Sequence, residues 1–127
     1  MRKPLAGLGL GLLASFATSA PAQTIEHGYP LGSLAVAAIE RQDWATAERL
    51  LNQVKGISRE DPARLINLGR VYAATGRLEL ARSALEQALA SSRHTEVETL
   101  SGQVSSTREL SRLALERLDS RVQIASQ

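Results

Sequence analysis

The sequence predicts an all-α protein in which antiparallel helix hairpins stack as a short α-solenoid, closed by a C-terminal capping helix. Three observations support this fold class. From Leu31 onward no stretch alternates apolar and polar residues as a half-buried strand does, and no β-branched run occurs. Proline is confined in this part to positions 30 and 62, where helices can begin. Alanine, leucine, arginine, glutamate and glutamine dominate, and these residues lose little freedom on entering a helix.

The first 22 residues have the three-part pattern of a secretory signal peptide. Arg2 and Lys3 precede a mostly apolar run, Leu5–Ala20, and small residues lead to a cleavage point after Ala22. A permanent anchor is the alternative, but a bilayer needs about 20 apolar residues and this run is shorter and diluted by glycine. We therefore expect export to the periplasm or the medium, with residues 23–29 as a flexible segment.

Composition narrows the possible partners and chemistry of the exported chain. Removing Arg2 and Lys3 turns 15 basic against 13 acidic residues into 13 against 13, so no net charge favours nucleic acid or anionic lipid. The absence of cysteine excludes disulfides, thiolate zinc sites and a cysteine nucleophile. No later run is long and apolar enough to span a membrane, so we expect no membrane insertion of the mature chain.

The clearest hairpin is predicted at residues 62–93. Asp61 is the expected N-cap of its first helix, and Pro62 has the fixed φ of a first helical position. Apolar residues recur at helical spacing until Gly76, which favours the left-handed conformation of a helix end. A second helix from Arg77 to about Ser91 completes a helix, turn, helix unit.

A shift of 34 residues indicates that this hairpin is repeated. Residues 28–61 laid on 62–95 place small residues on small ones and large apolar residues on large apolar ones. The first hairpin is therefore expected at about 31–41 and 44–54, with Gln42 in the turn. The matching pairs on the buried stripe include Leu31 with Leu65, Leu34 with Leu68, Ala47 with Ala81, and Leu51 with Leu85.

At these residues the sequence resembles the tetratricopeptide repeat family. Residues 62–93 match its pattern well, whereas residues 30–61 are a degenerate repeat in which Ala35, Ala38 and Gln42 replace the expected glycine, tyrosine and turn glycine. Small residues let two helices approach closely, and larger ones fill the gaps between hairpins. We expect Gly69 and Ala81 in the first role and Leu65, Tyr72 and Leu85 in the second. The residues that resemble the family signature are Leu65, Leu68, Gly69, Tyr72, Gly76, Ala81, Leu85 and Ala88.

Residues 94–127 do not continue the 34-residue phase and are assigned to C-terminal capping helices and a tail. Apolar residues at helical spacing predict a helix after Thr107, its expected N-cap. This stripe comprises Leu110, Leu113, Ala114 and Leu118. A shorter helix through Val97, Leu100 and Val104, interrupted near Gly102, is expected before it.

The sequence contains no pattern typical of a catalytic or metal site. His27 and His94 have no second ligand at helical spacing and are expected to be exposed, and no serine lies in a nucleophile motif. Glu60 and Asp61 fit capping better than acid–base catalysis, and no phosphate-binding glycine loop occurs outside the signal segment. We therefore expect no enzyme activity, metal or cofactor.

The family resemblance also implies a binding surface. In that family the first helix of each hairpin lines a concave groove that holds an extended peptide or a partner helix. The groove candidates implied here are Val36, Glu40, Ile66, Asn67 and Arg70. Arg70 can pair with a partner carboxylate. The alternative is a surface ion pair between Arg70 and Glu40, which contributes under about 1 kcal/mol.

These features predict a non-catalytic, exported helical-repeat module that binds a protein or peptide, as an adaptor or assembly factor in a bacterial cell envelope. The alternative is a structural subunit. Two repeats are fewer than the roughly three that usually make a stable array, so the chain could self-associate through an exposed repeat end as a homo-oligomer.

Overall fold

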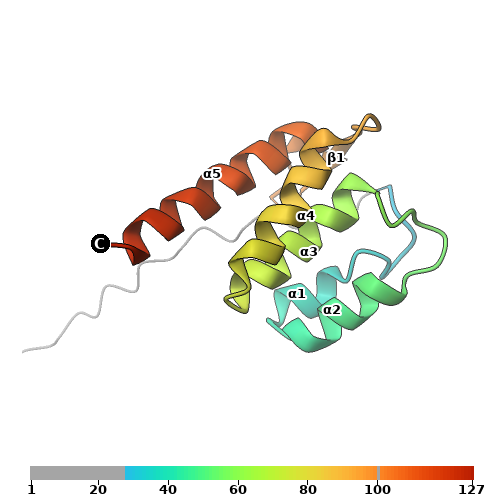
Figure 1. Ribbon diagram of the computed structural model, residues 1–127. Coiled ribbons are helices and arrows are strands. Elements are labelled where there is room, and N and C mark those ends of the chain that lie inside the picture. Colours follow the sequence, from blue (N-terminus) through green and yellow to red (C-terminus); the bar gives the residue numbers. More distant parts are fainter. Residues whose placement is uncertain (1–27, 100) are drawn as a thin grey trace, which may run out of the picture.

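The computed structural model describes residues 28–99 and 101–127. Within them the fold is all-α, as predicted, with one small β-hairpin (Figure 1). The predicted signal peptide and most of the segment 23–29 lie outside the described residues. The elements are α1 (Val36–Glu40), α2 (Trp44–Gln53), α3 (Pro62–Ala74), α4 (Leu78–Ala90), β1 (Glu96–Glu98), β2 (Val104–Ser106) and α5 (Thr107–Ala125).

The predicted second hairpin is confirmed as α3 and α4. Asp61 caps α3, because its Oδ1 accepts a hydrogen bond of 3.0 Å from the backbone N–H of Arg64. Gly76 has φ 76° between the helices, the left-handed conformation that glycine adopts without strain. Gly69 lies against Leu85, so close that a Cβ on Gly69 would be 2.7 Å from Leu85 Cγ. Leu85 therefore packs within its own hairpin, and not only between hairpins as expected.

The first hairpin is shorter than predicted. Its first helix begins at Val36 and not at Leu31, whose side chain is 96% exposed and cannot pair with the buried stripe. The reason is local: Gly32 and Ala35 have φ of 78° and 56°, so the chain makes turns before the helix starts. Gln42, with φ 57°, takes the left-handed turn position that glycine fills in the second hairpin.

The segment before α5 is a β-hairpin and not the expected short helix. Val97 pairs with Ser105 in an antiparallel register. Val97 is buried while its neighbours in β1 are exposed, which is the alternation of a strand with one packed face. Gly102, with φ 77°, lies in the connection. Helix α5 follows as predicted, although its N-cap is Ser106, which accepts from the N–H of Glu109, and not Thr107.

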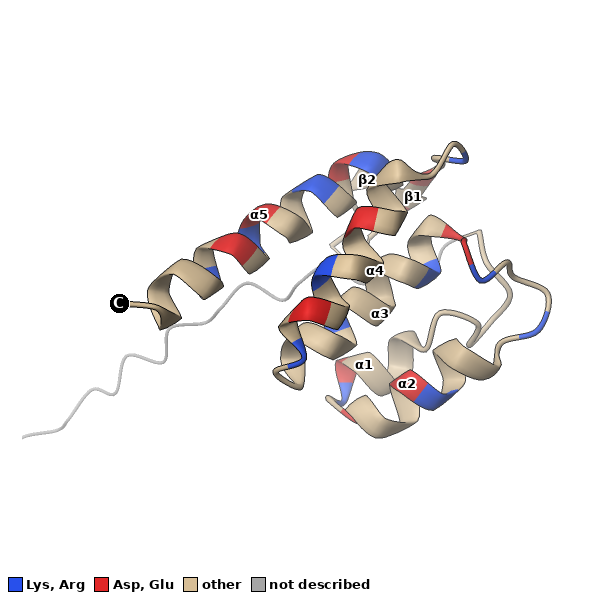
Figure 2. Cartoon of the chain, in the orientation of Figure 1, with Lys and Arg blue, Asp and Glu red and all other residues tan. Residues whose placement is uncertain are grey.

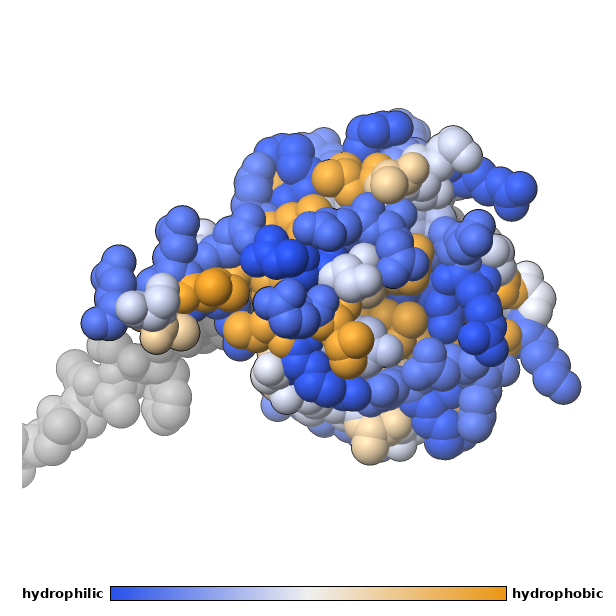
Figure 3. Space-filling view, viewed as in Figure 1, coloured by the Kyte–Doolittle hydropathy of each residue, from blue (hydrophilic) through white to orange (hydrophobic). Residues whose placement is uncertain are grey.

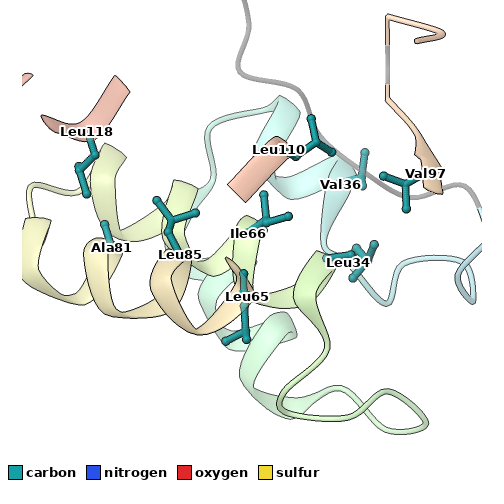
Figure 4. Close-up of a cluster of buried hydrophobic side chains, with 11 residues drawn as sticks. Leu34, Val36, Leu65, Ile66, Ala81, Leu85, Val97, Leu110 and Leu118 are labelled. Atoms are coloured by element: carbon teal, nitrogen blue, oxygen red, sulfur yellow. The ribbon is translucent and has the colours of Figure 1, made fainter. Parts of the chain in front are cut away.

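Helix α3 is the centre of the packing. Nine of its thirteen residues are buried, because hydrophobic clusters lie on two of its sides. On one side α3 and α4 meet α5 and Val97, and Figure 4 shows Ile66 of α3 close to Leu110 of α5. The other cluster joins α3 and α4 to the first hairpin, and consists of Ala35, Ala38, Ile39, Ala47, Leu51, Leu68, Val71 and Ala84.

Polar contacts fix the elements around this centre. Arg77, at the start of α4, forms a two-point ion pair with Glu48 of α2, with distances of 2.9 and 2.6 Å. Arg82 of α4 and Asp119 of α5 form another at 2.6 Å. These contacts join the two hairpins and α5 into one packed body. Among the described helices, none is long and apolar enough to cross a membrane.

Candidate functional site

The five predicted groove residues do not share one surface in the structure. Asn67 is fully buried, and its Nδ2 donates a hydrogen bond of 2.9 Å to the backbone oxygen of Leu34. Val36 is also buried, in the cluster shared with α5. These two side chains hold the fold together and do not line an open surface, so that part of the prediction was wrong. Glu40 is exposed. Arg70 is half-buried and borders a hollow beside α5, and Ile66 lines the same hollow although it is only 6% exposed.

Packing explains why Asn67 is buried whereas Arg70 borders the hollow. The sequence spacing predicted that Asn67 and Arg70 lie opposite the core stripe of α3, but Asn67 is fully buried, so this side is not free. The turn before α1 brings the Leu34 carbonyl over Asn67. Helix α5 covers the adjoining strip of α3, and only the part of the surface near Arg70 stays open.

The open part is a groove between α3 and α5, which we call the α3–α5 groove. It encloses about 300 Å³, and α4 contributes to its floor. Figure 3 shows apolar surface between α5 and the helices beside it. The groove is lined by Ile66, Arg70, Ala73 and Ala74 from α3, Leu85 from α4, and Leu110, Leu113, Ala114, Arg117, Leu118 and Arg121 from α5.

Among the described residues, the charged side chains that line this groove are all basic. Its three charged side chains are Arg70, Arg117 and Arg121, and no aspartate or glutamate lies among the described lining residues. Burial lowers the pKa of Arg70, and the nearby charge of Glu40 partly opposes this shift. Because arginine keeps its charge in proteins, the groove combines an apolar floor with fixed positive charge.

Two of the groove arginines, Arg121 and Arg117, differ in their contacts. Arg121 reaches the end of α3, where its Nη1 lies 3.5 Å from the backbone oxygen of Ala73. A cation near a helix C-terminus is favourable, because the last carbonyls carry partial negative charge. Arg117 is exposed and makes no ion pair with a carboxylate in the described part of the chain. Its guanidinium is therefore available to a ligand.

Comparison with known proteins gives the family. A profile described as tetratricopeptide repeat matches residues 33–104, which is more than half of the chain. The chain belongs to the tetratricopeptide repeat family. No curated protein and no solved structure matches it. Tetratricopeptide repeats generally mediate protein–protein interactions, and the family is generally non-catalytic.

The match to the tetratricopeptide repeat ends before α5 begins at Thr107. Helix α5 nevertheless packs against both helices of the second hairpin, α4 and α3 (Figure 1). It supplies one wall of the groove, including Arg117 and Arg121. The groove of this protein is therefore built partly from a segment outside the repeat match.

Sequence reasoning missed the α5 wall although a signal was present. The apolar stripe of α5 was recognised, and Arg117 and Arg121 fall on it, seven and eleven residues after Leu110. Two arginines on the apolar stripe of a capping helix are unexpected if the whole stripe is core, because unpaired charges are rarely buried. The presence of these arginines indicates that the C-terminal half of the α5 stripe borders solvent.

His94 has a structural position and not the exposed one expected. Its Nε2 lies 3.1 Å from the backbone oxygen of Leu89, and its Nδ1 lies 3.1 Å from the hydroxyl of Thr107. Thr107 Oγ1 also accepts from the N–H of Thr95, so these bonds join the end of α4 to the start of α5. In the described residues no group of three or more histidine, aspartate or glutamate side chains could hold a metal ion.

Proposed function

We propose that this protein is a non-catalytic adaptor or assembly factor that binds another protein through the α3–α5 groove, after export to a bacterial cell envelope. The observation that carries the proposal is an apolar groove formed by a tetratricopeptide repeat hairpin and α5, whose described lining includes three arginines and no acidic residue. A hollow that is lined mostly by apolar side chains and carries a few charged groups is typical of a binding site.

Export is supported by the pattern of residues 1–22. Expression of the full chain in a Gram-negative host tests it. Mass spectrometry of the periplasmic fraction should show a polypeptide that begins at Gln23. Full-length protein retained in the cytoplasm or held in the membrane would refute export and processing.

Blocking the groove tests the site of binding. In Ala114→Trp a large side chain replaces a small one in the α5 wall, so it should reduce partner recovery from an envelope extract. Ala45→Trp is the matched control, because Ala45 is exposed on α2 away from the groove lining. Circular dichroism should show that both variants keep their helix content. Undiminished recovery with Ala114→Trp would reject the groove as the binding site.

Self-association through an open repeat end has less support. Helix α5 and the β-hairpin cover apolar residues of the second hairpin that an open end would expose, including Leu65, Ala81 and Leu85. Sedimentation velocity of the mature protein should therefore show a monomer. A stable dimer at micromolar concentration would favour the structural-subunit alternative.

A further inference from the structure

We propose that the α3–α5 groove selects an amphipathic helix whose apolar face is bordered by carboxylates. This inference rests on the proposed function and names the chemistry of the partner at that site. Three features of the described residues support it: the form of the apolar floor, the sign of its charge and the extension of α5 beyond the groove.

The floor consists of side chains repeated at helical spacing on two neighbouring helices. Ile66, Arg70 and Ala73 follow one another along α3, and Leu110, Ala114 and Arg117 do so along α5. The walls offer few backbone hydrogen-bonding groups, since those of a helix are already paired within it. A docked helix pairs its own N–H and C=O groups internally, so it needs no such partners from these walls. Helical side-chain ridges also fit between those of the two walls.

The charge of the groove favours an acidic partner. The acidic side chains of α5 are used elsewhere: Glu109 and Glu116 pair with Arg112 on an exposed face, and Asp119 pairs with Arg82 of α4. Figure 2 shows acidic and basic residues interleaved along α5. The groove side is different, because Arg117 and Arg121 have no carboxylate beside them in the described lining. Carboxylates at the edge of a docked helix would supply the missing counter-charge.

Helix α5 offers more length than the groove itself. At 1.5 Å per residue α5 is about 28 Å long and α3 about 20 Å, and the C-terminal end of α5 projects from the body (Figure 1). Ile124 on this projecting end is 76% exposed. It lies eleven residues after Leu113, which is close to three full turns, so both side chains lie on one face. An apolar side chain therefore recurs on this face beyond Arg117 and Arg121, which suits a helical partner of several turns.

Three synthetic helical peptides test this selectivity. The first has a leucine face flanked by glutamates, the second has lysine in place of each glutamate, and the third keeps the glutamates but has serine in place of each leucine. Fluorescence anisotropy with the mature protein should show binding of the first, weakened by salt because the charges are partly exposed. The other two should bind at least about tenfold more weakly. Equal binding of the lysine peptide, or of the serine peptide, would overturn the inference.

Charge reversal in the protein makes the test specific. Arg117→Glu should weaken binding of the glutamate peptide and strengthen binding of the lysine peptide, so that the preference for the glutamate peptide is reduced or reversed. Arg108→Glu is the control, since it makes the same charge change on an exposed residue of α5 outside the groove lining. It should keep the wild-type preference. An unchanged preference in Arg117→Glu, or an equal change in Arg108→Glu, would refute recognition by the groove arginines.

The outcomes separate this inference from the proposed function. If both leucine-faced peptides bind equally and Ala114→Trp abolishes both, the groove binds partners without regard to charge, and only the selectivity is wrong. If none of the peptides binds, the amphipathic helix is the wrong partner class. The recovery of the natural partner with Ala114→Trp then decides the proposed function independently.

Discussion

Arg64 provides a quantitative test of how the two hairpins are joined. It lies in the first turn of α3, yet its side chain is only 5% exposed. Its Nε donates to the backbone oxygen of Leu51 at 2.6 Å, and its Nη1 donates to that of Arg59 at 2.7 Å. A longer contact of 3.3 Å reaches Asn52 Oδ1. One guanidinium thus connects the end of α2 and the following loop to the start of α3.

The size of the effect follows from these contacts. Hydrogen bonds to a charged group contribute about 1.5–3 kcal/mol each, and two of the three contacts are short. Burial opposes this gain, and it also lowers the pKa of Arg64. Replacing Arg64 by methionine removes the cost of burying the cation but leaves the Leu51 carbonyl without this donor. We therefore expect Arg64→Met to lower the free energy of unfolding by about 2–4 kcal/mol.

Urea unfolding followed by circular dichroism measures this loss. Arg64→Lys should also be destabilising, because an ammonium cannot reproduce the fixed fork of a guanidinium. Arg108→Met, which removes an exposed arginine from α5, should change stability by no more than about 0.5 kcal/mol. If Arg64→Met were as stable as Arg108→Met with an unchanged urea dependence, the guanidinium would not join the hairpins as described.

Three further substitutions test the hairpin contacts. Gly69→Ala gains about 1 kcal/mol of helix propensity, but it places a Cβ against buried Leu85. Calorimetry should therefore show a net loss of stability of up to about 2 kcal/mol. This loss should be smaller in a Leu85→Ala background, where the contact is relieved. Asp61→Ala should cost about 1 kcal/mol in urea unfolding, because the α3 cap is lost; no loss would show that the cap is unimportant. The hydrogen bond from Arg77 holds the pKa of Glu48 below its ordinary 4.5, although burial opposes the shift. The ion pair therefore stabilises the folded protein at neutral pH, and this stabilisation is lost as the pH falls through the folded-state pKa. Glu48→Gln should therefore lower the free energy of unfolding at neutral pH and not at about pH 2, and a difference that persists in acid would contradict this linkage.

The second hairpin could be predicted from the sequence because its signals are local. Asp61, Pro62 and Gly76 each fix a helix end through their own backbone geometry or a hydrogen bond three residues away. The first hairpin was harder, because Ala35 is a good helix former that here takes a left-handed conformation at the start of α1. The residue type alone does not predict that conformation, because the surrounding turn imposes it.

The groove could be predicted only in part, because it depends on long-range packing. The family resemblance named Arg70 and Ile66 as groove candidates, and both border the hollow, but the sequence could not show that Leu34 would cover Asn67. It identified the apolar stripe of α5 without showing which helix the stripe would face. The three-residue strands were missed because they are too short for a periodic signal, and the first contains only one buried side chain, Val97.

The central claim, that α5 lies along α3 and forms the groove with it, can be tested most directly with a spin label. The sequence has no cysteine, so Arg117→Cys offers a single attachment site on α5. The label should strongly broaden the amide signals of α3 between Ile66 and Ala74, and it should leave those of α2 sharper, since α2 lies on the other side of α3 in Figure 1. Equal broadening of α2 and α3, or none in α3, would contradict the account.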